Sequence, residues 1–321
     1  MQFIGCDVSK ATLDLAHFDQ ARRVPNSRHG WDALLRWAAQ SIQAPRDALC
    51  VVMEATGVYH LKAAAYLASA GLKVIVANPG RSAEYARSQN QLNKNDRLDA
   101  RALARYGAQL HKPHWYTPEG PEISQLKALL SRLRQLGKDL QREHNRLEKC
   151  AFLAGSQLLR RSVQRQTKAM TREQALIQRH IDQLIKNHPH LRGNQQLMCS
   201  IKGIGKTTSQ WLLPLLSTQR FNSAREVAAF LGLVPCHKSS GTTLQSRGRL
   251  SGRGNKDLRA RLYMPAISAA TNDPEMRAFY QTLLARGKTP KQALTAVMRK
   301  LVHICYGVVK NQTPYQQNYA A

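Results

Sequence analysis

The feature that most constrains the fold is a long stretch without proline. Residues 123–185 contain no proline, and leucine and isoleucine recur there among arginine, glutamine and lysine. Leucines fall three and four residues apart, at Leu126, Leu129, Leu130, Leu133 and Leu136. This spacing predicts one long helix, or two helices interrupted at Gly155 and Ser156, in an antiparallel hairpin or an oligomeric coiled coil.

Such a helical stretch divides the chain into three parts. Residues 112–122 carry three prolines and a glycine and are typical of a linker. We predict a first domain at 1–115, a helical coiled-coil spacer or oligomerisation segment at 116–190, and a mostly α-helical domain at 191–321.

The first part alternates short apolar runs with segments of helical spacing. The expected strands are residues 2–8, 13–18, 48–55 and 73–79. The expected helices are residues 34–43, 61–71 and 95–107. The order β-β-α-β-α-β predicts an α/β domain with a mixed sheet.

Charge is distributed unevenly along the chain. Lys and Arg number 48 against 20 Asp and Glu, which gives a net charge of +28. The excess is +5 over residues 1–120, +9 over 121–200 and +14 over 201–321. This balance favours DNA or RNA as the partner over a merely solvated basic face or an anionic membrane, since there is no amphipathic anchor.

No segment reaches the roughly 18 apolar residues that a membrane span needs, and the N-terminus lacks the regions of a signal peptide. The six cysteines are scattered, without CxxC or zinc-finger spacing. We therefore expect a cytoplasmic protein without disulfides or structural zinc.

Four acids stand out in the nearly neutral first part. Asp7 lies in an apolar strand, Glu54 ends another, and Asp96 and Asp99 lie three apart on one face of a helix. Four oxygen ligands of this kind can hold two divalent ions, which assist phosphodiester cleavage. The alternative is that these acids are solvated or cap helices, although a carboxylate inside an apolar strand is costly without a partner.

Two basic signals follow in the last part. Gly203-Ile204-Gly205 joins two apolar helices in a helix-hairpin-helix pattern, with Lys202 and Lys206 placed for a phosphate. A tight turn used only for packing is the alternative.

The second signal is the cation-rich segment 230–266, with Ser239 and Ser240 near its start. Its cations are Lys238, Arg247, Arg249, Arg253, Lys256, Arg259 and Arg261. A serine flanked by fixed cations could attack a phosphodiester, although Ser-Gly pairs mostly form turns.

These strings resemble a known family. GCDVSKATLDLA, MEATGVY, NPG and KNDRLDARALARYG are similar to the RuvC-like, DEDD-type domain of bacterial insertion-sequence transposases, to which Piv-type DNA invertases are related. GLVP, a serine before glycine and RGRLSGRGNKDLRARL resemble the serine-bearing C-terminal domain of the same family. Asn95 departs from the pattern, because the family more often has Thr there.

The resemblance implies an α/β RNase H-like fold for residues 1–115, with Asp7, Glu54, Asp96 and Asp99 as Mg²⁺ ligands. It implies that Ser240 is the catalytic serine, with Ser239 as the alternative if the match slips by one residue. It further implies a homo-oligomer, dimer or tetramer, whose two halves meet across subunits, and a non-coding bridge RNA that guides donor and target DNA. A bacterial, nucleoid-associated location follows from the same resemblance.

The predicted function is therefore site-specific DNA recombination through a serine–phosphate intermediate, assisted by Mg²⁺. A RuvC-like nuclease or junction resolvase would need the four acids but no serine. A non-catalytic nucleic-acid-binding protein would need neither.

Overall fold

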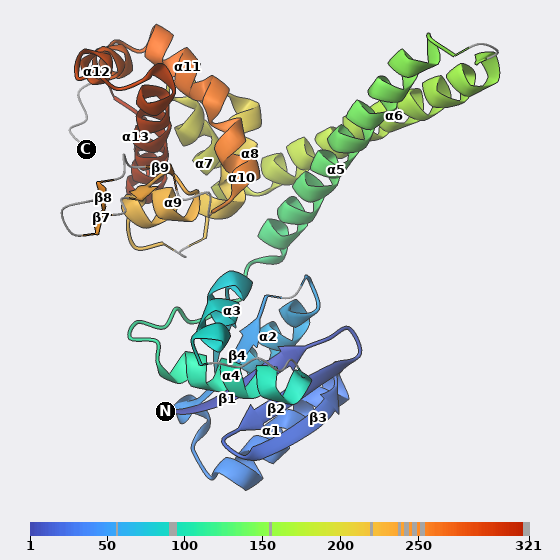
Figure 1. Cartoon of the computed structure of the whole chain (residues 1–321), viewed down its shortest axis with the longest axis vertical. Helices are drawn as coiled ribbons and strands as arrows, with labels where there is room; N and C mark the ends of the chain where they lie inside the picture. The colour runs from blue at the N-terminus through green and yellow to red at the C-terminus, as the bar shows by residue number, and fades with distance from the viewer. Residues whose placement is uncertain are drawn as a thin grey trace. The chain divides into compact units, whose positions relative to one another are not determined.

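The computed structural model describes residues 1–55, 57–89, 95–153, 156–218, 221–236, 239–240, 244–245, 249–250 and 254–316. Only the backbone is described for Ser239, Ser240, Leu244, Gln245 and Arg249. The chain divides into two compact units, residues 1–118 and 119–321 (Figure 1).

The first unit is built on a mixed five-stranded sheet in the order β3-β2-β1-β4-β5. The strands are β1 (Gln2–Val8), β2 (Thr12–His17), β3 (Gln20–Pro25), β4 (Leu49–Glu54) and β5 (Lys73–Ala77). Strands β1, β2 and β3 pair antiparallel, whereas β1, β4 and β5 pair parallel. The predicted mixed α/β sheet is confirmed.

Two elements of this unit were not predicted, namely β3 and the helix α3 (Pro79–Ser88). Strand β3 reads QARRVP, and its exposed arginines hide the apolar alternation that marks a strand. Helix α3 begins at Pro79, which suits the first turn of a helix, after the N-cap Asn78.

Helices cover both faces of the sheet. One face packs on α1 (Arg28–Ile42) and α2 (His60–Ser69), whose Leu34, Trp37 and Leu67 join Ile4 in one buried cluster. The other face packs on α4 (Asp96–Ala108), through Leu103 against Val52. A short 3₁₀ turn at Arg46–Ala48 leads into β4.

Helix α4 lies unusually close to strand β1, because Gly5 has no side chain. A Cβ atom at Gly5 would stand 1.7 Å from the carbonyl oxygen of Ala100. Gly107 allows a second close approach at the C-terminal end of α4, where a Cβ atom would stand 2.4 Å from a methyl group of Val52 on β4. The N-terminal turn of α4 is thereby held over the end of β1.

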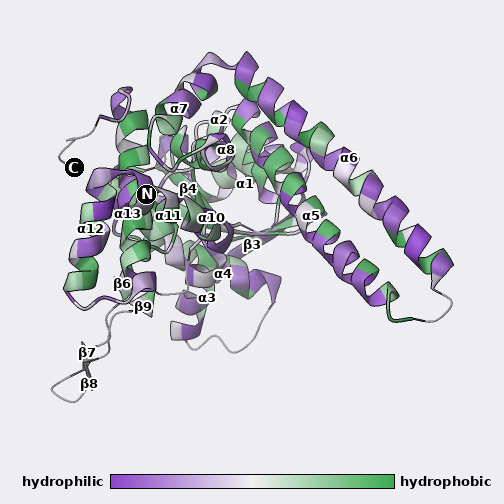
Figure 2. Ribbon diagram, turned by 90° about the horizontal axis from the view of Figure 1, so that it is seen from above, coloured by the Kyte–Doolittle hydropathy of each residue, from purple (hydrophilic) through white to green (hydrophobic). Residues whose placement is uncertain are grey.

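The second unit begins with a pair of long helices, α5 (Pro121–Cys150) and α6 (Gln157–Asn187). They lie side by side as a hairpin, so the proline-free stretch forms two helices rather than one (Figure 1). Hydrophilic and hydrophobic residues alternate along both helices, as expected for elements with one buried side (Figure 2). That the hairpin of α5 and α6 is a coiled coil stays a prediction.

The rest of the second unit is mostly helical. Its helices are α7 (Pro189–Cys199), α8 (Lys206–Leu216), α9 (Ala224–Phe230), α10 (Lys256–Arg261), α11 (Tyr263–Asn272), α12 (Pro274–Ala285) and α13 (Pro290–Asn311). Two strand pairs, β6 (Pro235–Cys236) with β9 (Arg249–Leu250) and β7 (Ser239–Ser240) with β8 (Leu244–Gln245), complete it. Helix α13 contributes Val297, Leu301 and Cys305 to the core. No helix in the described part of the chain is long and apolar enough to span a membrane.

Candidate active site

A row of polar side chains crosses the sheet of the first unit at one end. Asp7 on β1 lies directly opposite Asp14 on β2, and Asp14 lies opposite Arg23 on β3. Residues opposite one another point to the same face of a sheet, and residues two apart on a strand share that face. Gly5 faces α4, so Asp7, Asp14 and Arg23 face the side that α4 covers.

Glu54 extends this row to the next strand. Met53 pairs with Cys6, so Glu54 stands in register with Asp7 at the end of the parallel pair β1 and β4. Val52, two residues earlier, faces α4, which places Glu54 on the same face. The buried Ser82 of α3 donates a hydrogen bond of 3.1 Å to Glu54 Oε2 and thereby fixes the carboxylate.

Helix α4 brings the other two predicted acids to this face. Asn95 caps the helix, because its side-chain oxygen accepts a hydrogen bond of 2.8 Å from the Leu98 amide. Asp96 and Asp99 then fall in the first turn, where negative charge is favoured by the helix dipole. Asparagine caps as well as threonine does, so the departure at Asn95 keeps the local structure intact.

Arg23 ties the helix acids to the sheet acids. Its guanidinium donates 2.7 Å hydrogen bonds to Asp14 Oδ1 and to Asp96 Oδ2. Asp14 is buried, whereas Arg23 and Asp96 are more than half exposed. A hollow of about 340 Å³ opens beside these three side chains.

Negative charge is crowded around Asp7. Burial raises the pKa of Asp7, and the nearby Asp96 and Asp99 carboxylates raise it further. A hydrogen bond of 3.0 Å from the Val8 amide opposes that rise. A divalent cation between these carboxylates would relieve the repulsion, so the donor set fits a hard metal ion such as Mg²⁺.

The carboxylates do not yet converge on one point. In the described part of the chain, no group of three or more His, Cys, Asp or Glu side chains is arranged to hold a metal ion. The ion pair between Asp96 and Arg23 explains part of this, since it directs Asp96 toward β3.

The predicted serine lies on a small hairpin of the second unit. Ser239 pairs with Gln245 and Ser240 with Leu244, so the backbone of both serines is extended. The pair of β6 and β9 flanks this hairpin, and Gly254, at a φ of +94°, lies close to Phe230 and Gly232. Gly254 therefore anchors the C-terminal end of the segment where a larger residue would clash.

The predicted nucleic-acid contacts divide into distinct environments. Lys202 and Lys256 are exposed, whereas Lys206 forms a 2.7 Å ion pair with Asp182 of α6. Arg259 donates a hydrogen bond of 3.0 Å to the Leu231 carbonyl, so it stabilises the fold at least in part. Lys238, Arg247 and Arg253 lie outside the described residues, and Arg249 is described by its backbone in β9 alone.

The turn between α7 and α8 has a packing role of its own. Gly203 adopts a φ of +95°, and a Cβ there would stand 2.6 Å from the Pro265 carbonyl oxygen of α11. Gly205 has open space around it. Packing therefore explains Gly203, and the helix-hairpin-helix role stays a prediction.

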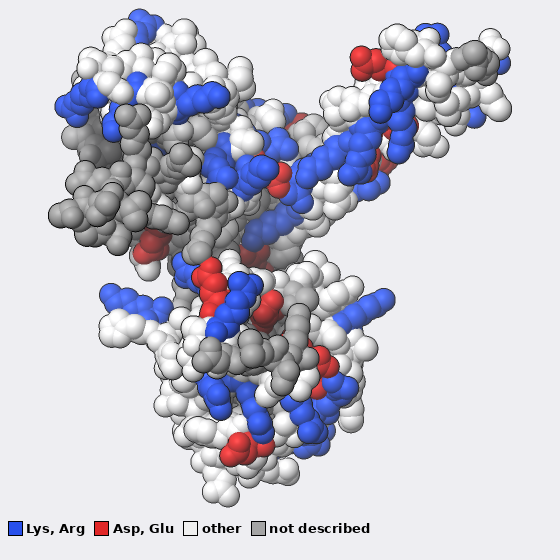
Figure 3. Space-filling model, in the orientation of Figure 1, with Lys and Arg blue, Asp and Glu red and all other residues white. Residues whose placement is uncertain are grey.

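A stripe of exposed cations runs along α6 and was not predicted as a nucleic-acid contact. The stripe consists of Arg161, Arg165, Lys168, Arg172, Arg179 and Lys186, all exposed. They follow one another at spacings of three, four or seven residues, which places them along one side of the helix. Figure 3 shows Lys and Arg gathered along the hairpin. We call this set the α6 stripe.

Comparison with known proteins bears on the whole chain. A family model described as "Transposase" matches residues 4–153, and one described as "Transposase IS116/IS110/IS902 family" matches residues 195–281. The pilin gene-inverting proteins of Moraxella bovis and Moraxella lacunata are each 32% identical over 321 residues, covering 98% of both chains. This chain belongs to the IS110 family of transposases.

Another relative extends the likeness. The transposase for insertion sequence element IS1111A of Coxiella burnetii is 24% identical over 98% of this chain and 92% of its own length. Membership of the IS110 family implies an enzyme that cuts DNA, and the sequence strings that carry the resemblance fall inside the matched segments.

Three residues beside the acids of this IS110-family chain were not predicted from the sequence. Asp14 lies in the same string as Asp7, and its alternation with apolar neighbours could have placed it on the same face. Arg23 gave no signal, because β3 was not recognised. Ser82 gave none either, since its bond to Glu54 joins residues 28 positions apart.

Proposed function

We propose that the chain is a site-specific DNA transposase or recombinase that cuts and rejoins strands through a phosphoserine intermediate. Asp7, Glu54, Asp96 and Asp99 would hold Mg²⁺ on an RNase H-like domain, and Ser240 would be the nucleophile. The observation that supports the proposal is that Asp7 and Glu54 lie at the ends of neighbouring strands on one face of the sheet, and that Asp96 and Asp99 lie in the first turn of α4, the helix that covers this face.

In the first step, the Ser240 hydroxyl oxygen attacks a DNA phosphorus and loses its proton. A bond forms between Ser240 Oγ and phosphorus, and the bond from phosphorus to the 3′ oxygen breaks. The departing 3′ oxygen takes up a proton, and the 5′ phosphate stays on the serine. Attack by the 3′ hydroxyl of another strand reverses these steps, so rejoining needs no external energy source.

The protein contributes positions and charges to this chemistry. Ser82 holds the Glu54 carboxylate and Asn95 caps the first turn of α4, so that Glu54 and the backbone of this turn are held in place before the substrate arrives. A bound Mg²⁺ would supply positive charge at the phosphate oxygens. The cations near Ser240 would add to that charge.

The partners in this proposal are donor DNA, target DNA and a non-coding guide RNA, and the active form is a homo-oligomer. The +28 charge and the α6 stripe support a long polyanionic ligand. The family resemblance supports the RNA and the oligomer. Discrete RNA should therefore copurify with the chain, and recombination that survives its removal by nuclease would reject the guide.

The serine is tested by trapping the covalent adduct on nicked suicide DNA. Ser240→Ala should abolish the adduct and leave nucleic-acid binding intact, whereas Ser239→Ala should retain the adduct. Loss of the adduct in Ser239→Ala alone would move the nucleophile by one residue.

The acids are tested by charge removal at constant size. Asp7→Asn or Asp99→Asn should remove Mg²⁺-dependent cleavage and keep DNA binding. Full activity of either variant would reject the metal-site assignment.

A RuvC-like nuclease or resolvase is the second candidate, because the four predicted acids lie in one unit and such an enzyme needs no serine. Such an enzyme would release free ends, and its cleavage would persist in Ser240→Ala. The same trapping experiment therefore separates the two.

A further inference from the structure

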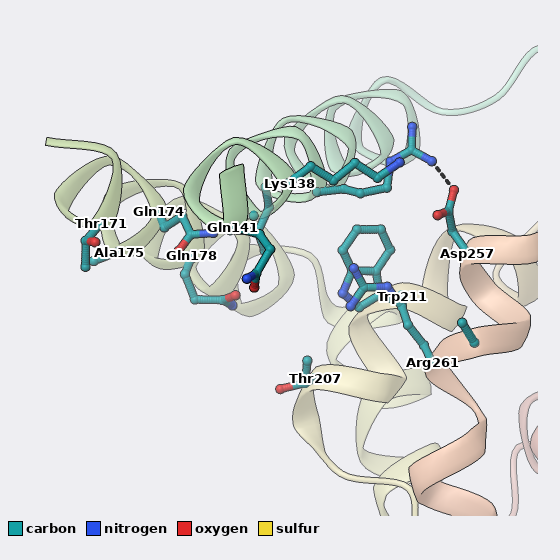
Figure 4. A pocket seen from close by; sticks show the side chains of 14 residues that line it. Lys138, Gln141, Thr171, Gln174, Ala175, Gln178, Thr207, Trp211, Asp257 and Arg261 are labelled. Atoms are coloured by element: carbon teal, nitrogen blue, oxygen red, sulfur yellow. Dashed lines mark hydrogen bonds and ion pairs between the residues drawn. The ribbon is translucent and has the colours of Figure 1, made fainter. Parts of the chain in front are cut away.

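The second unit contains a hollow of about 820 Å³ between the helical hairpin and helices α8 and α10 (Figure 4). Its size lies within the range of about 300–1,000 Å³ that is usual for small-molecule sites. The residues that line it include none of the four predicted acids and no residue of β7 or β8.

One wall of the hollow is a stack of two planar groups. The Arg261 guanidinium carbon stands 3.5 Å from the centre of the Trp211 ring. An approach at the ring edge could not be that close, so the guanidinium lies over the ring face. A stacked guanidinium presents its other face as the next layer, and nucleobases stack on both aromatic rings and arginine planes.

The opposite wall offers a hydrogen-bond acceptor. The Gln178 amide nitrogen donates to Asp182 Oδ1 at 3.2 Å and to Gln210 Oε1 at 3.0 Å. Because a carboxylate only accepts, this bond fixes the orientation of the amide and leaves the carbonyl oxygen for a donor. The exocyclic amino groups of adenine, cytosine and guanine are such donors, whereas thymine and uracil lack an amino group and offer only the ring N3–H.

The charge of the hollow suits a phosphate. Arg134, Lys138 and Arg261 line it, and Asp257, the one acid among the described residues of its lining, forms an ion pair with Arg134. Lys138 is exposed at the rim. Burial lowers the pKa of Arg261, but an arginine side chain stays charged, so its charge is held in a poorly solvated place where a ligand can approach.

We propose that this hollow binds one unstacked nucleotide of a single-stranded nucleic acid. The base extends the Trp211–Arg261 stack and donates its amino group to Gln178, and the phosphate lies at Lys138. The inference rests on the proposed function, because strand exchange and guide pairing both present unpaired bases. A duplex keeps its bases stacked on one another and offers no free base face.

The test uses the full chain labelled with 5-fluorotryptophan, with the four resonances observed by ¹⁹F NMR and that of Trp211 assigned from Trp211→Phe. Oligonucleotides of about eight adenines, as DNA and as RNA, should move the Trp211 resonance, and an equal length of thymines should move it less. The oligonucleotide that binds more tightly, DNA or RNA, identifies the kind of strand that the hollow takes. A fixed Trp211 resonance, while fluorescence anisotropy shows the oligonucleotide bound, would overturn the proposal.

Matched lysines on α5 give the second readout. Lys138→Gln should weaken the binding that moves the Trp211 resonance about five- to tenfold near 0.1 M salt, since one phosphate contact is lost. Lys149→Gln removes the same charge three turns further along the same side of the helix and outside the hollow, so it should leave that binding unchanged. Equal weakening by both variants would reduce the effect to general charge and reject the site.

This experiment needs neither metal nor cleavage. It can be run in chelator and with Ser240→Ala, so failure of the recombination chemistry would leave the Trp211 shift in place.

Discussion

At the residue scale, Gly5 determines how closely the helix acids approach the sheet acids. A methyl group there would stand 1.7 Å from the Ala100 carbonyl oxygen, a backbone atom that cannot turn aside. Helix α4 would have to move away from β1, and Asp96 and Asp99 would move with it. The absent side chain is thus as much a part of the candidate site as the carboxylates.

Gly5→Ala should therefore destabilise the first unit by about 2 kcal/mol or more, as over-packing does, and reduce Mg²⁺-dependent cleavage. Gly193→Ala is the matched control, because that helical glycine has open space around it and alanine favours helices. Three of the four tryptophans lie in residues 1–118, so urea unfolding followed by tryptophan fluorescence reports this unit. Equal midpoints for both variants would show that α4 tolerates displacement.

Asp7 should cost stability in the absence of metal. Its pKa is raised in the folded state by burial and by Asp96 and Asp99, so the folded state binds more protons than the unfolded state. Stability therefore falls as pH rises through the window between the ordinary pKa of 3.8 and the raised value. Above that window the ionised Asp7 lowers the free energy of unfolding.

We expect Asp7→Asn to be more stable than the natural chain at pH 7 without metal, and the difference to vanish below pH 3.8. Mg²⁺ should raise the melting temperature of the natural chain and have little effect on Asp7→Asn. Thermal denaturation at several pH values measures both effects. A variant less stable than the natural chain at pH 7 would contradict the crowding of charge at this position.

At the element scale, the α6 stripe accounts for much of the charge excess in the middle of the chain. The double variant Arg165→Gln, Arg172→Gln removes two members of the stripe. For long DNA, the plot of log affinity against log salt concentration should become less steep by about two. Arg142→Gln with Arg146→Gln removes the same charge from α5, where each arginine pairs with Asp139 or Glu143. If the two pairs of substitutions change the slope equally, the stripe is no special contact surface.

The two glycines of the turn between α7 and α8 allow its packing role to be tested by substitution. Gly203→Ala should destabilise the second unit, because its φ is +95° and its Cβ position meets the Pro265 carbonyl. Gly205→Ala meets nothing and should leave stability nearly unchanged. Circular dichroism at 222 nm during heating measures both, and a stable Gly203→Ala variant would contradict the packing described for this turn.

Helices and strands could be predicted from the sequence where their residue patterns lie within one continuous segment. Strand β4 and the two hairpin helices follow from apolar runs and leucine spacing, which the sequence shows directly. Strand β3 did not, because an exposed edge strand carries charged residues and is defined by its pairing with β2. The α6 stripe is a different case. Its regular spacing is visible in the sequence, but the total charge of residues 121–200 does not show that the cations share one side of a helix.

At the scale of the whole molecule, charge and chemistry are divided along the chain. The four predicted acids lie in the first 120 residues, where the charge excess is +5, whereas the predicted serine lies within residues 201–321, where it is +14. Sequence motifs predict the four acids and the serine, because each stands in a recognisable string, and their catalytic roles stay predictions. They could not indicate Arg23, Ser82 or the Trp211–Arg261 stack, since those contacts join residues that are far apart in sequence.

The most direct measurement of the central claim is the position of the DNA adduct in the chain. Trypsin cuts after Lys238 and after Arg247, which releases a peptide that contains both Ser239 and Ser240. After trapping on suicide DNA and nuclease trimming, mass spectrometry should find the nucleotide remnant on Ser240, dependent on Mg²⁺ and absent in Asp7→Asn. A remnant on another residue, or cleavage without any adduct, would contradict the account.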